Sequence, residues 1–336
     1  MIQLKFKFNG KIVQNDKNTA IKMKNFNHFL LTIFNVKRIK PKFSGLQKLH
    51  ASLNRKEFIL NGKKVVDNPE TPIRLNEEYL ETRFRLFEKF CLPSVMSQSN
   101  QNFKWLVFFD TLTPDNCKKR IERYSSDYSN FVPIYIDEYN DVIVIKNAIT
   151  DNLKDNPEYL ITSVLDNDDA ICRDYVKLVQ EEFNEQKFTA VTFPYGYVWK
   201  EPRGKIYLRE YLSNPFISLI ESIDNFQTVY HVPHQEYVPR YSKLGLLKPI
   251  QTKPTWMQVI HGSNVRNRVE GIRKPRKNIG NDFSINVENT LIDENFLFLG
   301  LELPINYTQS ITLKSIRYLR ERWAQIEQER SIPKNK

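Results

Sequence analysis

The sequence predicts an α/β protein in which helices flank a largely parallel sheet. Three observations support this: short apolar runs bounded by turn signals, helical patterns between these runs, and acidic residues directly after two of them. The chain has 336 residues, of which 40% are hydrophobic and 26% charged, so it can bury a large core. Scarce glycine (10 residues) and the lack of a fixed-period repeat exclude collagen-like, propeller and solenoid architectures.

The first apolar run, residues 29–36 (FLLTIFNV), predicts a buried strand. A basic, irregular connection follows from position 37 to about position 74, and turn signals such as Asn61-Gly62 indicate a hairpin within it. A helix is expected next, because Asn76 can cap it and apolar residues then recur at helical spacing, at Leu80, Phe84, Phe87 and Cys91. Pro93 breaks or kinks that helix.

Three further strands alternate with helices in the middle of the chain. The continuous apolar run 105–110 (WLVFFD) is typical of a buried parallel strand, and Thr113-Pro114-Asp115 opens the helix after it. Residues 132–137 and 159–166 predict the next two strands. The helix that follows has one apolar face, formed by Ile171, Tyr175, Leu178 and Phe183.

The second half of the chain has a mixed pattern. Strands are predicted at residues 188–199, 206–211, 228–232 and 256–261, and a short helix at residues 214–221. An amphipathic helix near the end carries apolar residues at Leu313, Ile316, Leu319, Trp323 and Ile326. No linker is long enough to force a second independent domain.

The net charge of +11 is unevenly distributed. Residues 1–60 carry a local charge of +11, residues 137–185 carry −9, and residues 262–280 carry +5. An acidic centre between basic flanks indicates a metal-binding or cation-screened site that accepts an anionic ligand. The basic excess also leaves binding to nucleic acid or to a membrane surface open.

The three cysteines, Cys91, Cys117 and Cys172, are widely spaced and odd in number. This fits free thiols in a reducing compartment better than a disulfide framework or a zinc site. No apolar run approaches the roughly 20 residues that a membrane span needs, and no signal-peptide pattern opens the chain. The sequence therefore predicts a cytoplasmic protein.

The strongest local signal is the acidic segment 166–169 (DNDD), directly after a predicted strand. Each pair of like charges at about 4 Å costs roughly 4 kcal/mol at an effective dielectric near 20, and a divalent cation removes that cost. Oxygen ligands suit Mg²⁺ or Mn²⁺. The alternative is that Asp168 or Asp169 caps a helix that begins near Ala170, which explains one acid but not three.

Several familiar motifs are absent. The sequence has no Gly-rich dinucleotide fingerprint, no GxxxxGK[ST] loop, no HExxH and no GxSxG. This argues against dehydrogenase, P-loop kinase, zinc protease and serine hydrolase functions. Metal-assisted transfer from a nucleotide diphosphate donor remains the natural candidate.

Five segments together resemble the bacterial family named Putative rhamnosyl transferase, which belongs to the GT-A type of glycosyltransferase. They are residues 29–36, 79–97 (YLETRFRLFEKFCLPSVMS), 102–110 (NFKWLVFFD), 161–170 (ITSVLDNDDA) and 256–262 (WMQVIHG). The resemblance implies a GT-A-like (Rossmann-like) fold over residues 27–265. Residues 1–26 would then form a basic N-terminal segment, and residues 266–336 a basic C-terminal extension that ends in the amphipathic helix.

The resemblance also implies roles for single residues around a divalent ion. Residues 166–168 would be the DxD motif, with Asp168 as metal ligand and Asp166 facing the metal or the donor ribose. His261 would be a further metal or diphosphate ligand. Arg83 and Arg266 would bind the donor, and Arg266 would neutralise the leaving diphosphate.

The nucleoside end of the donor has its own expected residues. The resemblance implies that Asp110 hydrogen-bonds the base or the ribose, and that Thr32, Phe34 and Asn35 line the base pocket.

A general base must take the proton of the acceptor hydroxyl if the transfer inverts the sugar. Glu221 is the first candidate, because it follows the site strands and ends a short predicted helix. Asp169, His234 and Glu236 remain open as alternatives.

The sequence thus predicts a glycosyltransferase that uses Mn²⁺ or Mg²⁺, a nucleotide-sugar donor and a glycan or lipid-linked acceptor. By resemblance, the sugar could be rhamnose. The basic residues 1–60 could dock peripherally on the anionic inner face of a membrane, and no nucleic-acid partner is expected. Two alternatives stay open: a metal-dependent nucleotidyltransferase or nuclease, and a non-catalytic nucleic-acid-binding protein.

Overall fold

The computed structural model describes most of the central part of the chain. The described residues are 25–37, 57–60, 63–66, 72–138, 143–202, 204–261, 269–274, 279–286, 304–309, 311–312 and 315–316. Residues 1–24 of the basic N-terminal segment and most of the C-terminal extension, including Arg266, therefore lie outside the described residues. Most of the last predicted helix also lies outside the described residues; residues 315–316, which include Ile316, are helical, as are residues 304–309 and 311–312 before it. Among the described residues, no helix is both long enough and apolar enough to cross a bilayer.

The first sheet has the strand order β12-β8-β11-β6-β1-β4-β5. Every strand in it except β11 runs in the same direction, because β11 pairs antiparallel with both of its neighbours. This confirms the predicted α/β class with a largely parallel sheet. The strands are β1 (Phe26–Ile33), β4 (Lys104–Asp110), β5 (Phe131–Ile136), β6 (Tyr159–Val164), β8 (Phe188–Thr192), β11 (Ser218–Ser222) and β12 (Leu247–Pro249).

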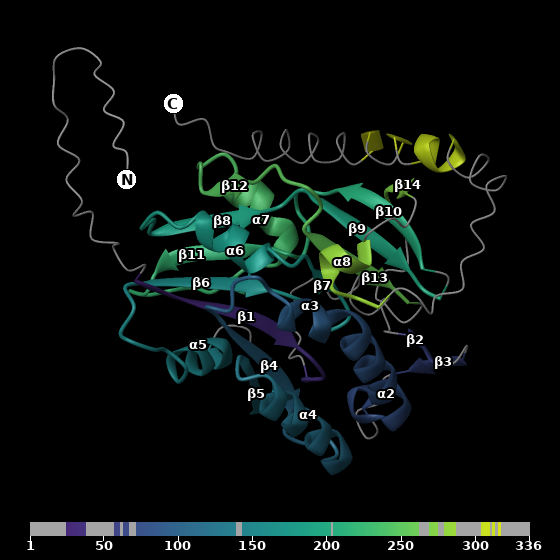
Figure 1. Ribbon diagram of the computed structural model, residues 1–336, viewed down its shortest axis with the longest axis horizontal. Helices are drawn as coiled ribbons and strands as arrows, with labels where there is room; N and C mark the ends of the chain where they lie inside the picture. The colour runs from purple at the N-terminus through teal and green to yellow at the C-terminus, as the bar shows by residue number, and fades with distance from the viewer. Residues whose placement is uncertain are drawn as a thin grey trace, which may run out of the picture.

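A second sheet has the order β14-β10-β9-β13-β7. Figure 1 shows it beside the first sheet, on the side toward which the carboxyl ends of β1 and β6 point. Its strands are β7 (Ala170–Ile171), β9 (Tyr195–Lys200), β10 (Lys205–Glu210), β13 (Trp256–Ile260) and β14 (Ile272–Lys274). A separate hairpin joins β2 (Glu57–Leu60) to β3 (Lys63–Val66), which confirms the hairpin expected around Asn61-Gly62.

The helix expected after Asn76 is present and capped as predicted, because the Asn76 side chain accepts a hydrogen bond from the Tyr79 amide. It changes into a π-helical turn before Pro93, which lies in the first turn of the next helix. The helical segments are η1 (Ile73–Leu75), α2 (Glu77–Leu86), η2 (Phe87–Cys91), α3 (Leu92–Met96), α4 (Asp115–Asp127), α5 (Ile143–Thr150), α6 (Tyr175–Glu181), α7 (His234–Tyr241) and α8 (Ile279–Phe283).

The core lies on both faces of the first sheet. Along β1, Phe29 and Leu31 belong to a cluster with apolar residues of α5 and α7. Leu30 belongs to the opposite cluster, which includes residues of α2, η2, α4, α6 and the second sheet. Burial on both faces explains why the central strands are continuously apolar rather than alternating.

Several predicted elements are wrong. Residues 218–222 form strand β11 instead of ending a helix, because a short apolar run fits either element and pairing with β6 and β8 decides. Residues 228–232 form turns, and the Val229 amide donates to the Thr162 hydroxyl rather than to a backbone carbonyl of a neighbouring strand. Residues 188–199 divide into β8 and β9, and α6 begins only at Tyr175.

Candidate active site

The acidic segment 166–169 forms a turn between β6 and β7, at the carboxyl ends of the parallel strands. Its Asn167 side chain donates to two carbonyl oxygens: that of Ile33 (3.0 Å), the last residue of β1, and that of Phe34 (2.9 Å), the next residue. Thr32 donates to the Leu165 carbonyl over 2.8 Å. These bonds fix the turn against the neighbouring strand. No helix begins at Ala170, so helix capping does not explain the acids.

Asp168 is the centre of the cluster. Its Oδ2 accepts from Arg83 Nη1 at 3.0 Å and from His261 Nε2 at 2.7 Å, and its side chain is 8% exposed. Burial alone raises the pKa of Asp168, but the charge of Arg83 and the hydrogen bond from His261 outweigh it and hold that pKa well below its usual range. Arg83 also donates to Asn167 Oδ1. The structure thus brings together three residues, Arg83, Asp168 and His261, that lie far apart in the sequence.

Asp169 and Asp166 have different surroundings. Asp169 is buried, and its Oδ1 accepts the Val259 amide at 2.8 Å, which ties the turn to β13. Burial, together with the charges of Asp168 and Asp166, raises the pKa of Asp169 well above its usual range. Asp166 is exposed, and its carbonyl accepts the Asp169 amide at 3.2 Å. Asp166 is therefore the acid of this turn that reaches solvent.

The donor set at Asp168 is compatible with a divalent cation that arrives with a substrate. Among the described residues, no group of three or more His, Cys, Asp and Glu side chains could hold a metal by itself. Mg²⁺, however, usually takes only one or two protein ligands and completes its shell with water and substrate phosphates. Asp168 Oδ2 and His261 Nε2 form such a pair, because a cation can replace the proton that joins them.

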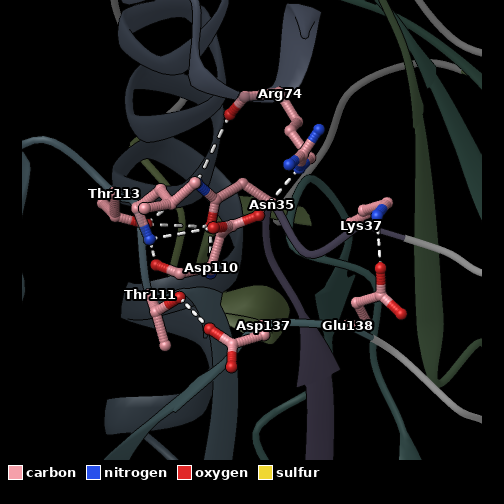
Figure 2. A network of polar contacts seen from close by, with 9 residues as sticks. Asn35, Lys37, Arg74, Asp110, Thr111, Thr113, Asp137 and Glu138 are labelled. Carbon is pink, nitrogen blue, oxygen red and sulfur yellow. Dashed lines mark hydrogen bonds and ion pairs between the residues drawn. The ribbon is translucent and has the colours of Figure 1, made fainter. Parts of the chain in front are cut away.

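A second polar cluster lies at the carboxyl ends of β1 and β4 (Figure 2). Asp110 is 1% exposed, and its Oδ2 accepts from Arg74 Nε at 2.7 Å while its Oδ1 accepts the Leu112 amide at 2.9 Å. Asn35 accepts the Asp110 amide at 3.2 Å and donates to the Thr113 hydroxyl at 3.1 Å. Asn35 and Asp110 were both predicted near the nucleoside, and the structure places them side by side.

Other predicted residues have structural surroundings. Phe34 is buried and packs against Phe84, with ring centroids 4.7 Å apart. Thr32 is also buried, and it accepts the Trp105 Nε1 hydrogen bond at 2.9 Å. Neither side chain is open to a ligand, so neither lines a pocket as predicted; both hold the end of β1 in place.

Glu221 is not brought to the acidic turn. Glu221 on β11 pairs with Leu160 on β6. Leu160 precedes Asp166 by six residues, and six residues of extended strand span about 20 Å. Its carboxylate accepts the amides of Gln227 (2.6 Å) and Thr228 (2.9 Å). Because β11 is the reversed strand, the end of β11 that carries Glu221 lies at the amino-terminal end of β6.

Of the two alternative bases on α7, His234 is linked to the carboxyl-end edge. His234 Nδ1 donates to the Ser213 carbonyl at 2.7 Å, and the adjacent Asn214 bonds the Phe193 carbonyl just beyond β8. Gln235 Nε2 lies 2.6 Å from His234 Nε2 and donates to it. Glu236 is bound instead by Arg240, whose Nε lies 2.7 Å from it.

Sequence patterns gave no indication of Arg74. It lies in the short η1 turn at the end of the irregular connection, where neither periodicity nor a motif marks it. Only its contact with Asp110, which had been identified, could have drawn attention to it.

An α/β domain with acidic and basic side chains gathered at the carboxyl ends of its parallel strands is the architecture of nucleotide-binding α/β proteins. Residues 66–273 match the family described as Putative rhamnosyl transferase, and the chain belongs to that family. The match includes Arg83, Asp110, Asp168 and His261, but it begins after β1. The comparison with curated proteins gives no match.

Several solved structures are similar at low identity. Staphylococcus aureus TarS 1–349 in complex with UDP is 12% identical, with a TM-score of 0.35, covering 53% of this chain and 57% of that chain. A Desulfovibrio desulfuricans G20 protein named "putative nucleotide-diphospho-sugar transferase" is 12% identical, with a TM-score of 0.31, covering 73% of this chain and 85% of that chain. The chain therefore spans little more than half of the TarS fragment.

Proposed function

We propose that this protein is a glycosyltransferase that transfers a sugar from a nucleoside diphosphate donor. The observation that carries the proposal is the Asp168 carboxylate, held ionised between Arg83 and His261 at the carboxyl ends of the parallel strands. Such a site suits an anionic diphosphate that binds together with a cation. Membership of the rhamnosyl transferase family supports the same class of reaction.

We further propose Mn²⁺ or Mg²⁺ as the cation, with Asp168 and His261 as its protein ligands. When bound, a divalent ion offsets the charge that develops on the departing diphosphate. Arg83 keeps Asp168 ionised, and its own charge adds to the positive potential at the leaving group. We propose that the exposed Asp166 contacts the ion or the donor ribose.

His234 is the proposed general base. Because its Nδ1 must carry the proton that it donates to the Ser213 carbonyl, its Nε2 is the basic nitrogen of the ring, and it accepts a hydrogen bond from Gln235 Nε2. Removing a general base lowers the rate by roughly 10²–10⁴-fold. His234→Asn is therefore expected to lower kcat far more than Glu236→Gln, whose carboxylate is paired with Arg240.

For the donor sugar and the acceptor, the proposal names only a chemical class. The family description suggests rhamnose, and a glycan or lipid-linked acceptor fits a sugar transferase. The strongly basic residues 1–60 would favour docking on an anionic membrane surface. Vesicles with and without anionic lipid would test this last point by co-sedimentation.

A nuclease or nucleotidyltransferase is the rival enzyme class. A two-metal enzyme needs several carboxylates around the ions, and no group of three metal-binding side chains occurs among the described residues. Asp110 ends β4, two strands away from β6, and it is already bound to Arg74. The geometry therefore favours sugar transfer.

The test is nucleoside diphosphate binding by titration calorimetry, with and without Mn²⁺, in the parent, Asp168→Asn and Asp127→Asn. Asp127 is an exposed acid at the end of α4 and serves as the matched control. The parent and the control should bind more tightly with Mn²⁺, and Asp168→Asn should lose that gain. Equal binding by Asp168→Asn, or nucleotide incorporation without any sugar, would contradict the proposal.

A further inference from the structure

We propose that Arg74 selects the nucleotide, favouring bases with a carbonyl at C6 of a purine or C4 of a pyrimidine (guanine, thymine or uracil) over adenine and cytosine, which carry an amino group there. The inference rests on the proposed function, because it assumes that a nucleoside diphosphate binds along this edge of the sheet. It assigns to Arg74 the recognition role that the sequence had suggested for Asp110.

The guanidinium of Arg74 is held in place from behind. Asp110 binds its Nε at 2.7 Å, and Asp110 itself is fixed by the Leu112 amide. The main chain of Arg74 is also fixed, because Asn35 Nδ2 donates to its carbonyl at 3.3 Å. A planar group fixed at one end presents its remaining donors in a defined direction at little entropic cost.

Its outer edge is the part open to a ligand. The Arg74 side chain is 21% exposed, whereas that of Asp110 is 1% exposed. Figure 2 shows the outer end of the guanidinium turned away from Asp110. No contact within the described part of the chain engages its two Nη groups, and these can only donate hydrogen bonds. A ligand at this edge therefore faces the two Nη donors of Arg74, while the Asp110 carboxylate is covered by the guanidinium.

The distance to the acidic turn suits a nucleotide. Strand β1 lies directly between β4, which ends at Asp110, and β6, which precedes Asp168. Two strand spacings amount to about 10 Å, the scale on which a nucleoside separates its base from its phosphates. The two clusters are also linked through the end of β1, because Asn167 binds the Phe34 carbonyl and the next residue, Asn35, binds Arg74.

The chemistry of the bases then decides the preference. Guanine offers O6 and N7 as two adjacent acceptors, which match an arginine fork, and thymine and uracil offer carbonyl oxygens. Adenine and cytosine place an amino donor at the corresponding position. Two donors that face each other in a partly desolvated site leave both without an acceptor, and this penalises binding.

The experiment measures the Kd values of GDP, TDP, UDP, CDP and ADP in the presence of Mn²⁺, for the parent, Arg74→Gln and Arg85→Gln. Arg85 is an exposed arginine on α2 and provides the matched control. In the parent and the control, at least one of GDP, TDP and UDP should bind about 10- to 100-fold more tightly than CDP and ADP. Arg74→Gln should remove most of that difference by weakening the preferred nucleotide.

Removing Arg74 leaves a buried carboxylate without its partner, so the double variant Arg74→Gln/Asp110→Asn is measured alongside to keep the test valid if the single variant unfolds. A folded variant with an unchanged preference would overturn the inference, and so would a parent that binds all five nucleotides equally. In both cases the proposed function stands. If the parent binds none of them with any cation, the proposed function itself fails.

Discussion

Replacing Arg83 with glutamine tests the electrostatic centre of the site. At 3.0 Å and an effective dielectric near 20, the attraction between Arg83 and Asp168 is about 5 kcal/mol before desolvation is counted. Both side chains are largely buried, with 13% and 8% exposed. Removing one partner of a buried pair costs roughly 3–5 kcal/mol, since the other charge stays buried. We expect Arg83→Gln to lower the free energy of unfolding at pH 7 by that amount.

The pH dependence gives the sharper check. In the parent, the pKa of Asp168 lies below its unfolded value, so its contribution to stability is present at neutral pH and is lost only in strong acid. Without Arg83, burial should raise the pKa of Asp168, so the variant can protonate it as the pH falls. Urea unfolding of the parent, Arg83→Gln and the exposed control Arg85→Gln at pH 7 and pH 5 measures both effects. A loss below about 1 kcal/mol at pH 7, or one equally large at pH 5, would refute the reasoning.

Two further predictions concern the fold. A Cβ added at Gly196 would lie 2.0 Å from the buried ring of Trp256, so Gly196→Ala should cost about 3 kcal/mol or more in urea unfolding, whereas Gly245→Ala meets no atom and should cost only about 1 kcal/mol for its positive φ. Burial raises the pKa of Glu221 to about 7, although two backbone amides favour its charged form. Because this exceeds the unfolded value of 4.5, the contribution of Glu221 is fully present below about pH 4.5 and is lost as the pH rises through 7, by about 3 kcal/mol in all. Glu221→Gln should remove that part of the pH dependence of the unfolding free energy between pH 5 and pH 8; an unchanged slope would contradict it.

The acidic turn could be predicted from sequence because its signal is local. A strand that ends in DNDD needs no partner to be recognised, and the same holds for the Asn76 cap. The contacts of Asp168 with Arg83 and His261 join residues 85 and 93 positions away. Only the resemblance suggested these residues, since no local pattern links them.

Glu221 shows where local patterns fail. The apolar run before Glu221 fits a helix or a strand equally well. The helical interpretation predicted Glu221 at the site, whereas in strand β11 it lies at the opposite end of the sheet. Arg74 was missed for a related reason, because an irregular connection carries no periodicity from which a side chain's direction follows.

The amino-acid order by itself determined the α/β class, most of the strands of the parallel sheet and the acids at the end of β6. Apolar period and turn chemistry are properties of neighbouring residues, so they survive without knowledge of the fold. Tertiary structure alone decided the reversed direction of β11, the burial of Asp168 and Asp169, and the contact of Arg74 with Asp110. Each of these depends on which distant segments exclude water from one another, and no short stretch of sequence contains that information.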